Sequence, residues 1–186
     1  MKHRVCLAAL LMAVMLTGCA TGYGPKGMTG GYEEQQIDDS SYRVSFYGNG
    51  NTDKDKVWNY WMYRCAELTK IKGFDFFNLI VEKKKTGAIP SDDGLRPANL
   101  RYGEEGRLIK TAGYYYYTPG STYTITTYHS SAIVKMYRNP LPPDVKFALK
   151  AQLVLDALKP YVESSGKEPA PKRDEIIGKA MVKGSP

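Results

Sequence analysis

Residues 52–82, TDKDKVWNYWMYRCAELTKIKGFDFFNLIVE, predict a long amphipathic helix followed directly by a buried strand. Thr52 is a suitable N-cap with Asp55 three residues on, and Gly73 suits the position after the last turn, so the helix is expected over about residues 53–72. The apolar residues recur at helical spacing over an unusually wide arc. This arc contains Val57, Trp58, Trp61, Cys65 and Leu68, with Met62 and Ile71 at its edges.

The same patterns predict the remaining elements. Alternating or continuous apolar runs indicate strands, Pro and Gly mark turns, and a second helical spacing follows late in the chain. The expected elements are strands at 42–47, 74–82, 107–117 and 122–137, a long loop at 83–106 and a helix at 144–159. The economical arrangement is α+β, with a single mixed sheet of about four strands and two helices packed on it.

Length and composition limit the class of protein. The chain has 186 residues, 42% of them hydrophobic, and a formal net charge of +7, which suits one globular domain. Two histidines and three cysteines are too few for a zinc ribbon or a disulfide framework. The longest apolar run is shorter than a membrane-spanning helix requires.

The N-terminus carries a targeting pattern. Basic residues at 2–4 precede an apolar run at 5–16, and Leu16-Thr17-Gly18-Cys19 follows. These four residues resemble the lipobox of bacterial lipoproteins. The alternatives are an ordinary secretory signal peptide and an amphipathic N-terminal helix.

The lipobox resemblance implies that diacylglycerol is attached to Cys19 and that the chain is cut between Gly18 and Cys19. Two or three acyl chains on one cysteine make a durable anchor. Ala20 stands where an Asp would favour retention in the inner membrane, so the resemblance points to the outer membrane, with the domain facing the periplasm.

These features divide the chain into four parts. Residues 1–18 are expected to be the signal peptide, and residues 19–40 the lipidated cysteine with a flexible Gly-rich tether. Residues 41–162 are expected to form the α+β periplasmic domain. Residues 163–186 are polar and are expected to be a disordered tail.

Segments of the domain resemble a family of small proteobacterial outer-membrane lipoproteins of unknown function. The best match is Tyr63-Arg64-Cys65-Ala66-Glu67-Leu68-Thr69 followed by Gly73-Phe74-Asp75-Phe76-Phe77, where Cys65 replaces the usual Ala. Tyr42-Arg43-Val44-Ser45-Phe46 with Gly48-Asn49 also fits, as does the Gly-rich stretch from Thr21 to Tyr32. The resemblance implies an envelope location and brings no known activity.

A polar cluster is predicted at Arg64, Glu67 and Asp75. Arg64 and Glu67 can pair on one helix flank, and Asp75 follows the turn. Arg64 falls at the edge of the apolar arc, where an unpaired charge would be costly. We favour an ion pair that fixes how helix and sheet meet over a small ligand site.

Other chemistry-bearing residues form no convincing catalytic set. Cys65 has only His129 as a possible activating base outside the signal peptide, and Cys65 is expected to be buried. The loop at 48–52 could cradle an anion but lacks the residues of a phosphate-binding loop. Tyr114 to Tyr117 put two tyrosines on each sheet face; we favour a β-rich stretch that shields its own hairpin over a surface for protein or glycan contacts. We expect no catalytic, cofactor-binding or metal site, and no enzyme.

A second apolar stripe is predicted on the 144–159 helix. Its main face contains Phe147, Ala151, Val154, Leu155, Leu158 and Val162. Val145, Leu149 and Leu153 are spaced by four and form a separate stripe, which the 83–106 loop or a partner must cover.

Together these observations favour a lipid-anchored envelope protein with a non-enzymatic interaction or assembly domain. The expected partners are the membrane, through Cys19, and an envelope protein or peptidoglycan; nucleic acid is not expected. The alternative is a small-ligand or anion-binding lipoprotein that uses the 48–52 loop with Arg64 and Glu67. A cell-wall hydrolase has the least support.

Replacing the lipobox cysteine tests the anchor. Cys19→Ser removes the thiol that accepts the lipid, so the chain should stay uncut and take up no labelled palmitate in cells, as measured by radiolabelling and gel mobility. Palmitate still entering the variant would contradict the assignment of Cys19.

Overall fold

The computed structural model describes residues 20–80, 95–103, 107–111, 114–118 and 122–184. The predicted signal peptide, its cleavage site and Cys19 lie outside these ranges, as does the stretch 81–94 of the predicted loop. No helix among the described residues is long and apolar enough to cross a membrane.

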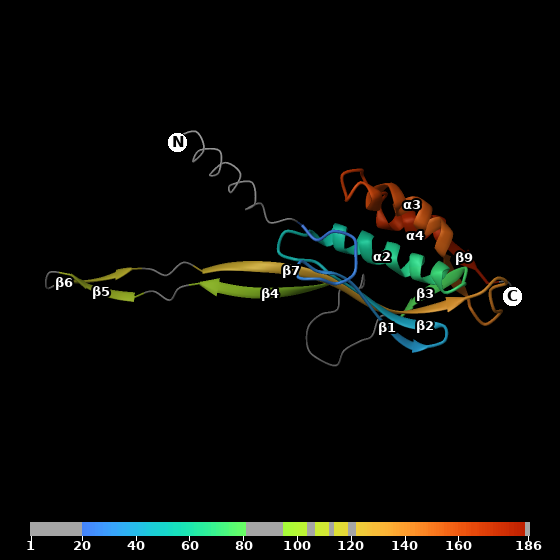
Figure 1. Ribbon diagram of the computed structural model, residues 1–186, viewed down its shortest axis with the longest axis horizontal. Coiled ribbons are helices and arrows are strands. Elements are labelled where there is room, and N and C mark those ends of the chain that lie inside the picture. The colour runs from blue at the N-terminus through green and yellow to red at the C-terminus, as the bar shows by residue number, and fades with distance from the viewer. Residues whose placement is uncertain (1–19, 81–94, 104–106, 112–113, 119–121, 185–186) are drawn as a thin grey trace, which may run out of the picture.

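The body of the protein is one antiparallel sheet arranged around its longest strand, β7 (Thr122–Tyr137) (Figure 1). β2 (Ser41–Tyr47) pairs with one edge of β7, and β3 (Phe76–Ile80) pairs with the other. β1 (Gly31–Asp38) extends the sheet beyond β2, and β8 (Phe147–Lys150) and β9 (Met181–Lys183) extend it beyond β3. The α+β class with a single main sheet is thus confirmed, with more strands than the four expected.

Helix α2 (Lys54–Ile71) connects β2 to β3 across the sheet. Both strands run antiparallel to β7 and therefore parallel to each other, with β7 inserted between them. The helix begins one residue later than predicted, because the Asp53 carboxylate rather than Thr52 accepts the first-turn amide of Lys56. It ends where Gly73 takes a positive φ of 77°, as its sequence position predicts.

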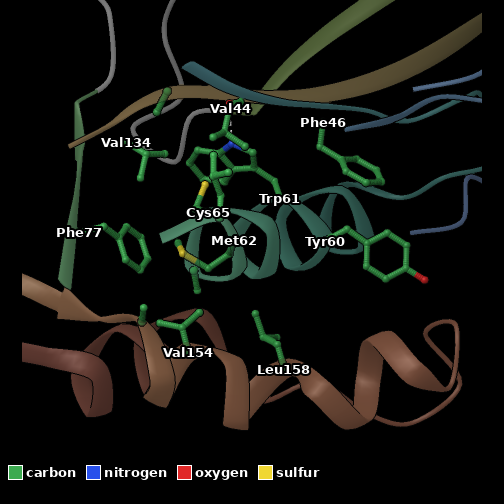
Figure 2. Close-up of a cluster of buried hydrophobic side chains, with 14 of the residues drawn as sticks. Val44, Phe46, Tyr60, Trp61, Met62, Cys65, Phe77, Val134, Val154 and Leu158 are labelled. Carbon is green, nitrogen blue, oxygen red and sulfur yellow. Dashed lines mark hydrogen bonds between the residues drawn. The ribbon is translucent and has the colours of Figure 1, made fainter. Parts of the chain in front are cut away.

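The wide apolar arc of α2 is explained by two covers. One side packs on the sheet, where Trp61 and Cys65 lie under Val44 and Val134, and the opposite side meets α3 (Ala151–Glu163) through Met62 (Figure 2). The indole N–H of Trp61 donates to the backbone oxygen of Val44 at 2.9 Å, so even the polar atom of this buried ring is satisfied. The helix is therefore the middle layer of the body, between the sheet and α3.

The predicted tether is wrong. Thr21 is buried, the ring of Tyr23 packs on Tyr60, and β1 begins at Gly31. Residues 24–26 run beside β1, where the Tyr32 amide donates to Gly24 O and the Lys26 amide donates to Tyr32 O. The folded body therefore starts at the first described residues rather than near residue 41.

The predicted disordered tail is also wrong, because residues 164–184 are part of the fold. α4 (Arg173–Ala180) inserts Ile176 and Ala180 into the main core, and β9 pairs with β8. Proline, glycine and charge suggested disorder over this stretch, whereas two buried side chains and three strand pairs hold it in place.

Two further expectations need correction. The range 83–106, predicted as loop, contains β4 (Leu95–Gly103), and the range 107–117 is divided into β5 (Arg107–Thr111) and β6 (Tyr114–Thr118), which pair with each other. The helix expected to begin at residue 144 begins at Ala151, because residues 147–150 join the sheet as β8 beside β3.

One part of the chain extends far from the body. β4 pairs with residues 122–130 of β7, and because β2 occupies one edge of β7 at residues 129–130, β4 uses the other edge. We call β4, β5, β6 and residues 122–128 of β7 the arm. In Figure 1 the arm leaves the body as a two-stranded ribbon, with the β5–β6 hairpin at its far end and none of the described helices over it. At about 3.3 Å per residue, β4 alone extends about 30 Å.

The role of the C-terminal segment can be tested with Ile176→Ala. Ile176 is 1% exposed, so its truncation should lower the free energy of unfolding by about 2–4 kcal/mol. Ile71→Ala is the matched control, since Ile71 is also helical but 63% exposed, and it should change stability by less than about 0.5 kcal/mol. Chemical denaturation measures the free energy of unfolding of both variants. Equal losses of stability in the two variants would contradict a packed C-terminal segment.

Candidate functional site

Arg64 joins three segments that are distant in the sequence. From α2 its guanidinium donates to the carboxylates of Glu34 on β1 and Glu67 on α2, and it lies over the ring of Tyr32 at 4.1 Å from the centroid. The hydroxyl of Tyr23, in the N-terminal segment, donates to the same Glu67 carboxylate. The Arg64 side chain is only 12% exposed. We call Tyr23, Glu34, Arg64 and Glu67 the clamp.

The electrostatics of the clamp keep its charges in place. Burial acts to lower the pKa of Arg64, but the hydrogen bonds to Glu34 and Glu67 outweigh it, so the pKa of Arg64 is raised. Burial and the hydrogen bond to Glu67 raise the pKa of the Tyr23 hydroxyl well above its usual value, so this group stays a donor. Both carboxylates pair with the Arg64 guanidinium, and Glu67 also accepts a hydrogen bond from the Tyr23 hydroxyl, so each charged group has a partner, which suits a structural role.

Asp75 is not part of the clamp, which corrects the predicted cluster. Its carboxylate accepts from the ammonium of Lys70 at 2.8 Å and from the amide of Asn139 at 3.2 Å. The Lys70 hydrogen bond lowers the pKa of Asp75. Asp75 therefore ties the end of α2 to the segment after β7, while Glu34, which sequence reasoning missed, takes its place beside Arg64.

Thr21 fixes the N-terminal segment to the loop between β2 and α2. Its amide donates to Thr52 Oγ1 at 2.8 Å, its hydroxyl oxygen accepts from the amide of Asn49 at 3.0 Å, and its hydroxyl donates to the backbone oxygen of Thr29. Thr21 is 1% exposed. Only Ala20 separates this residue from Cys19.

The glycine-rich loop at 48–52 is bound by the chain itself rather than shaped as an open anion cradle. The Asn49 amide is taken by Thr21, the Asn51 amide donates to Asn49 Oδ1 at 3.0 Å, and the Thr52 amide donates to Asn49 O at 3.0 Å. The Gly48 amide donates to Tyr128 O at 2.8 Å, where the arm leaves the body. Four of the five loop amides thus donate within the chain, which argues against the anion-binding interpretation.

Cys65 and His129 lie on opposite faces of the sheet. Cys65 is buried beneath the helix-facing side, and burial raises the pKa of its thiol well above the usual value, which disfavours the nucleophilic thiolate. His129 stacks on Tyr47 at the base of the arm, on the face that alternates with the one carrying buried Phe46. The prediction that Cys65 is buried is confirmed.

The predicted stripe of Val145, Leu149 and Leu153 does not form, because only Leu153 lies in a helix. Val145 belongs to a small cluster with Phe76 and Ala148, and Leu149 lies in β8 against the main core. The helix face that packs in α3 is instead Ala151, Val154, Leu158 and Tyr161. Phe147, expected on that face, is exposed.

A hollow of about 440 Å³ lies between the start of α2 and residues 170–173. Arg173 lines the hollow, donates to Asp55 at 2.7 Å and lies over the ring of Trp58. Asn59 and Tyr161 also line it. Among the described residues, no three histidine, cysteine or acidic side chains gather in a way that could hold a metal ion.

Tyr23 and Tyr32 are the signal that could have revealed the clamp from sequence. A flexible tether needs no aromatic residues, yet both tyrosines stand among the glycines of the N-terminal segment, and their rings meet at 5.5 Å. Gly30 and Gly31 adopt φ values of 105° and 124°, and a Cβ on Gly30 would approach Tyr47 O to 2.1 Å. These glycines permit tight packing rather than flexibility.

Comparisons with known proteins add no family: no family model, no curated protein and no solved structure matches this chain.

The clamp can be tested by removing its cation. Arg64→Met keeps most of the aliphatic stem but leaves Glu34 and Glu67 without their shared donor, so it should lower stability by about 2 kcal/mol. Tyr23→Phe should cost about 1 kcal/mol and should be non-additive with Arg64→Met, because both residues donate to Glu67.

The control for the clamp is Lys70→Met, which breaks the more exposed pair with Asp75 and should cost less than about 1 kcal/mol. Urea denaturation measures these three single variants and the double variant that combines Tyr23→Phe with Arg64→Met. If Arg64→Met costs no more than Lys70→Met, the clamp does not hold the N-terminal segment in place.

Proposed function

We propose that this protein is a lipid-anchored envelope protein whose non-enzymatic domain presents the arm to another envelope protein. The anchor is the lipidated Cys19, and the location is the outer membrane, facing the periplasm. The proposal rests on the arm, because the described residues of the hydrophobic core of the body all lie outside β4, β5 and β6. The domain would act as an interaction or assembly module.

The pairing register gives the arm two unlike faces. Residues opposite each other in antiparallel strands share a face, and faces alternate along the strand. Leu100 pairs with Ile125 and Tyr102 pairs with Tyr123, so these four residues fall on one face. The intervening pairs on the other face are Asn99 with Thr126 and Arg101 with Thr124. Over residues 99–102 of β4, the register therefore gives the arm one apolar and one polar face.

A two-stranded ribbon with an apolar face is marginally stable in water by itself. In the body, α2 covers the opposite face of the sheet, the one that carries Ala132 and Val134 of β7, so the face of Ile125 and Tyr123 continues the side of the sheet that faces away from α2. None of the described helices reaches the arm (Figure 1). Beyond the body, β4 pairs with β7 along one edge, and no described strand pairs with its other edge. That edge is therefore available for addition of a strand from a partner. Both features favour a protein partner.

The end of the arm is rich in tyrosine. β6 is Tyr-Tyr-Tyr-Tyr-Thr, and the register sets Leu108 opposite Tyr117 and Ile109 opposite Tyr116. Tyrosine supplies large contact area at low entropic cost and is enriched at the centre of protein interfaces. These features favour a protein partner over peptidoglycan.

Site-specific photo-crosslinking in cells tests this proposal. A photoreactive phenylalanine analogue is placed at Tyr116, near the end of the arm, or at Gln152, an exposed position on α3 that serves as the control. We expect discrete protein adducts from position 116 and none from position 152. Adducts that disappear on lysozyme treatment would identify peptidoglycan and contradict a protein partner, and equal yields at the two positions would contradict a role for the arm.

A further inference from the structure

The proposed lipid anchor leaves little freedom between membrane and body. Thr21 is hydrogen-bonded into the fold through its amide and its hydroxyl, and two residues of extended chain span at most about 7 Å. A flexible tether of the predicted length would have allowed the body to stand tens of ångströms from the bilayer. With the observed spacing, the end of the body that holds Thr21 must lie next to the lipid headgroups.

A tight turn of residues 27–30 is attached to this same point. The backbone oxygen of Thr29 accepts the Thr21 hydroxyl, and the Gly27 and Gly30 amides each donate to the other residue's carbonyl oxygen, at 2.9 and 3.2 Å. At the tip of this turn Met28 is fully exposed. A path through Thr21 and Thr29 places the Met28 backbone within about 15 Å of the Cys19 backbone.

The turn is held firmly rather than loosely. Gly30 packs against Tyr47 O and the Thr21 side chain, so closely that a Cβ there would clash with both. Lys26, just before the turn, donates to Glu33 at 2.9 Å and lies over the Tyr47 ring at 4.0 Å. The backbone of the turn is therefore fixed relative to Thr21 and to the base of the arm.

From this geometry we infer that the 27–30 turn is a membrane-docking element that inserts Met28 into the lipid interface beside the anchor. This inference rests on the lipidation of Cys19 in the proposed function. The N-terminal segment enters the body at the end where the arm leaves it, and α2 runs away from that end (Figure 1). The bilayer must therefore meet the body on the side of Thr21 and the turn. At this distance from the lipid anchor, the unbranched apolar side chain of Met28 enters the boundary between headgroups and acyl chains, where the apolar faces of amphipathic protein segments lie.

The consequence is a fixed orientation. A lipid on a flexible tether holds a domain near a membrane but lets it rotate. Two contacts, the acyl chains of Cys19 and the side chain of Met28, restrain that rotation. Gly48 and Tyr128 connect the same end of the body to the arm at 2.8 Å, so the direction of the arm relative to the membrane becomes restricted too.

Depth-dependent fluorescence quenching tests the inference on the full lipidated protein. Met28→Cys is labelled with an environment-sensitive dye and reconstituted into phosphatidylethanolamine–phosphatidylglycerol vesicles containing nitroxide lipids. The control is Ile37→Cys, at the opposite end of β1, where the native side chain is also exposed. Cys65 is buried and should not react. The label at position 28 should shift its emission to the blue and lose most of its intensity, while the label at position 37 keeps nearly all of its intensity.

Two results overturn the inference in distinguishable ways. If the protein floats with vesicles but position 28 is quenched no more than position 37, the lipid anchor stands and the docking turn is wrong. If the protein does not float with vesicles, the lipid anchor itself is wrong and the inference falls with it.

Discussion

The hydrogen bonds around Thr21 are the constraint on which the rest of the interpretation depends. They attach the chain immediately after Cys19 to the loop that connects β2 to α2. From that point Tyr23 enters the aromatic cluster with Tyr60 and Tyr63, and the clamp joins α2 to β1. The N-terminal segment is thus held by polar and apolar contacts at both ends, which makes it a part of the body.

The sequence predicted those elements whose own residues determine them. α2 was found because its apolar spacing, its acidic start and Gly73 all agree, and β2 and β3 because their apolar runs are short and dense. The alternation of Phe147–Lys150 resembled the start of a helix, because periodicity over four residues cannot distinguish the two states. Its pairing with β3 decides in favour of strand. Likewise Ile176 and Ile177 are a short apolar pair in a polar stretch, and only the position of α3 creates the site that Ile176 fills.

The candidate site shows the same division. Arg64 and Glu67 lie on one helix, so their pairing could be predicted from spacing, whereas Glu34 lies 30 residues away in sequence and reaches Arg64 only once β1 is paired. The prediction for Asp75 failed for the converse reason. Asp75 is near Arg64 in the sequence, but its carboxylate accepts from Lys70 and Asn139 instead. With every charge of the clamp paired internally, we interpret it as structure that supports the proposed anchor and arm rather than as a site of chemistry.

Amide hydrogen exchange at the N-terminal segment tests most directly whether this segment is folded. The amides of Thr21, Lys26 and Tyr32 donate to Thr52, Tyr32 and Gly24, respectively. If the segment is part of the body, these three amides should exchange slowly, with protection comparable to that of the Gly48 amide at the base of the arm. Exchange at the rate of an unfolded chain, with Gly48 still protected, would show that the segment is a tether after all and would contradict the direct attachment of the body to the membrane.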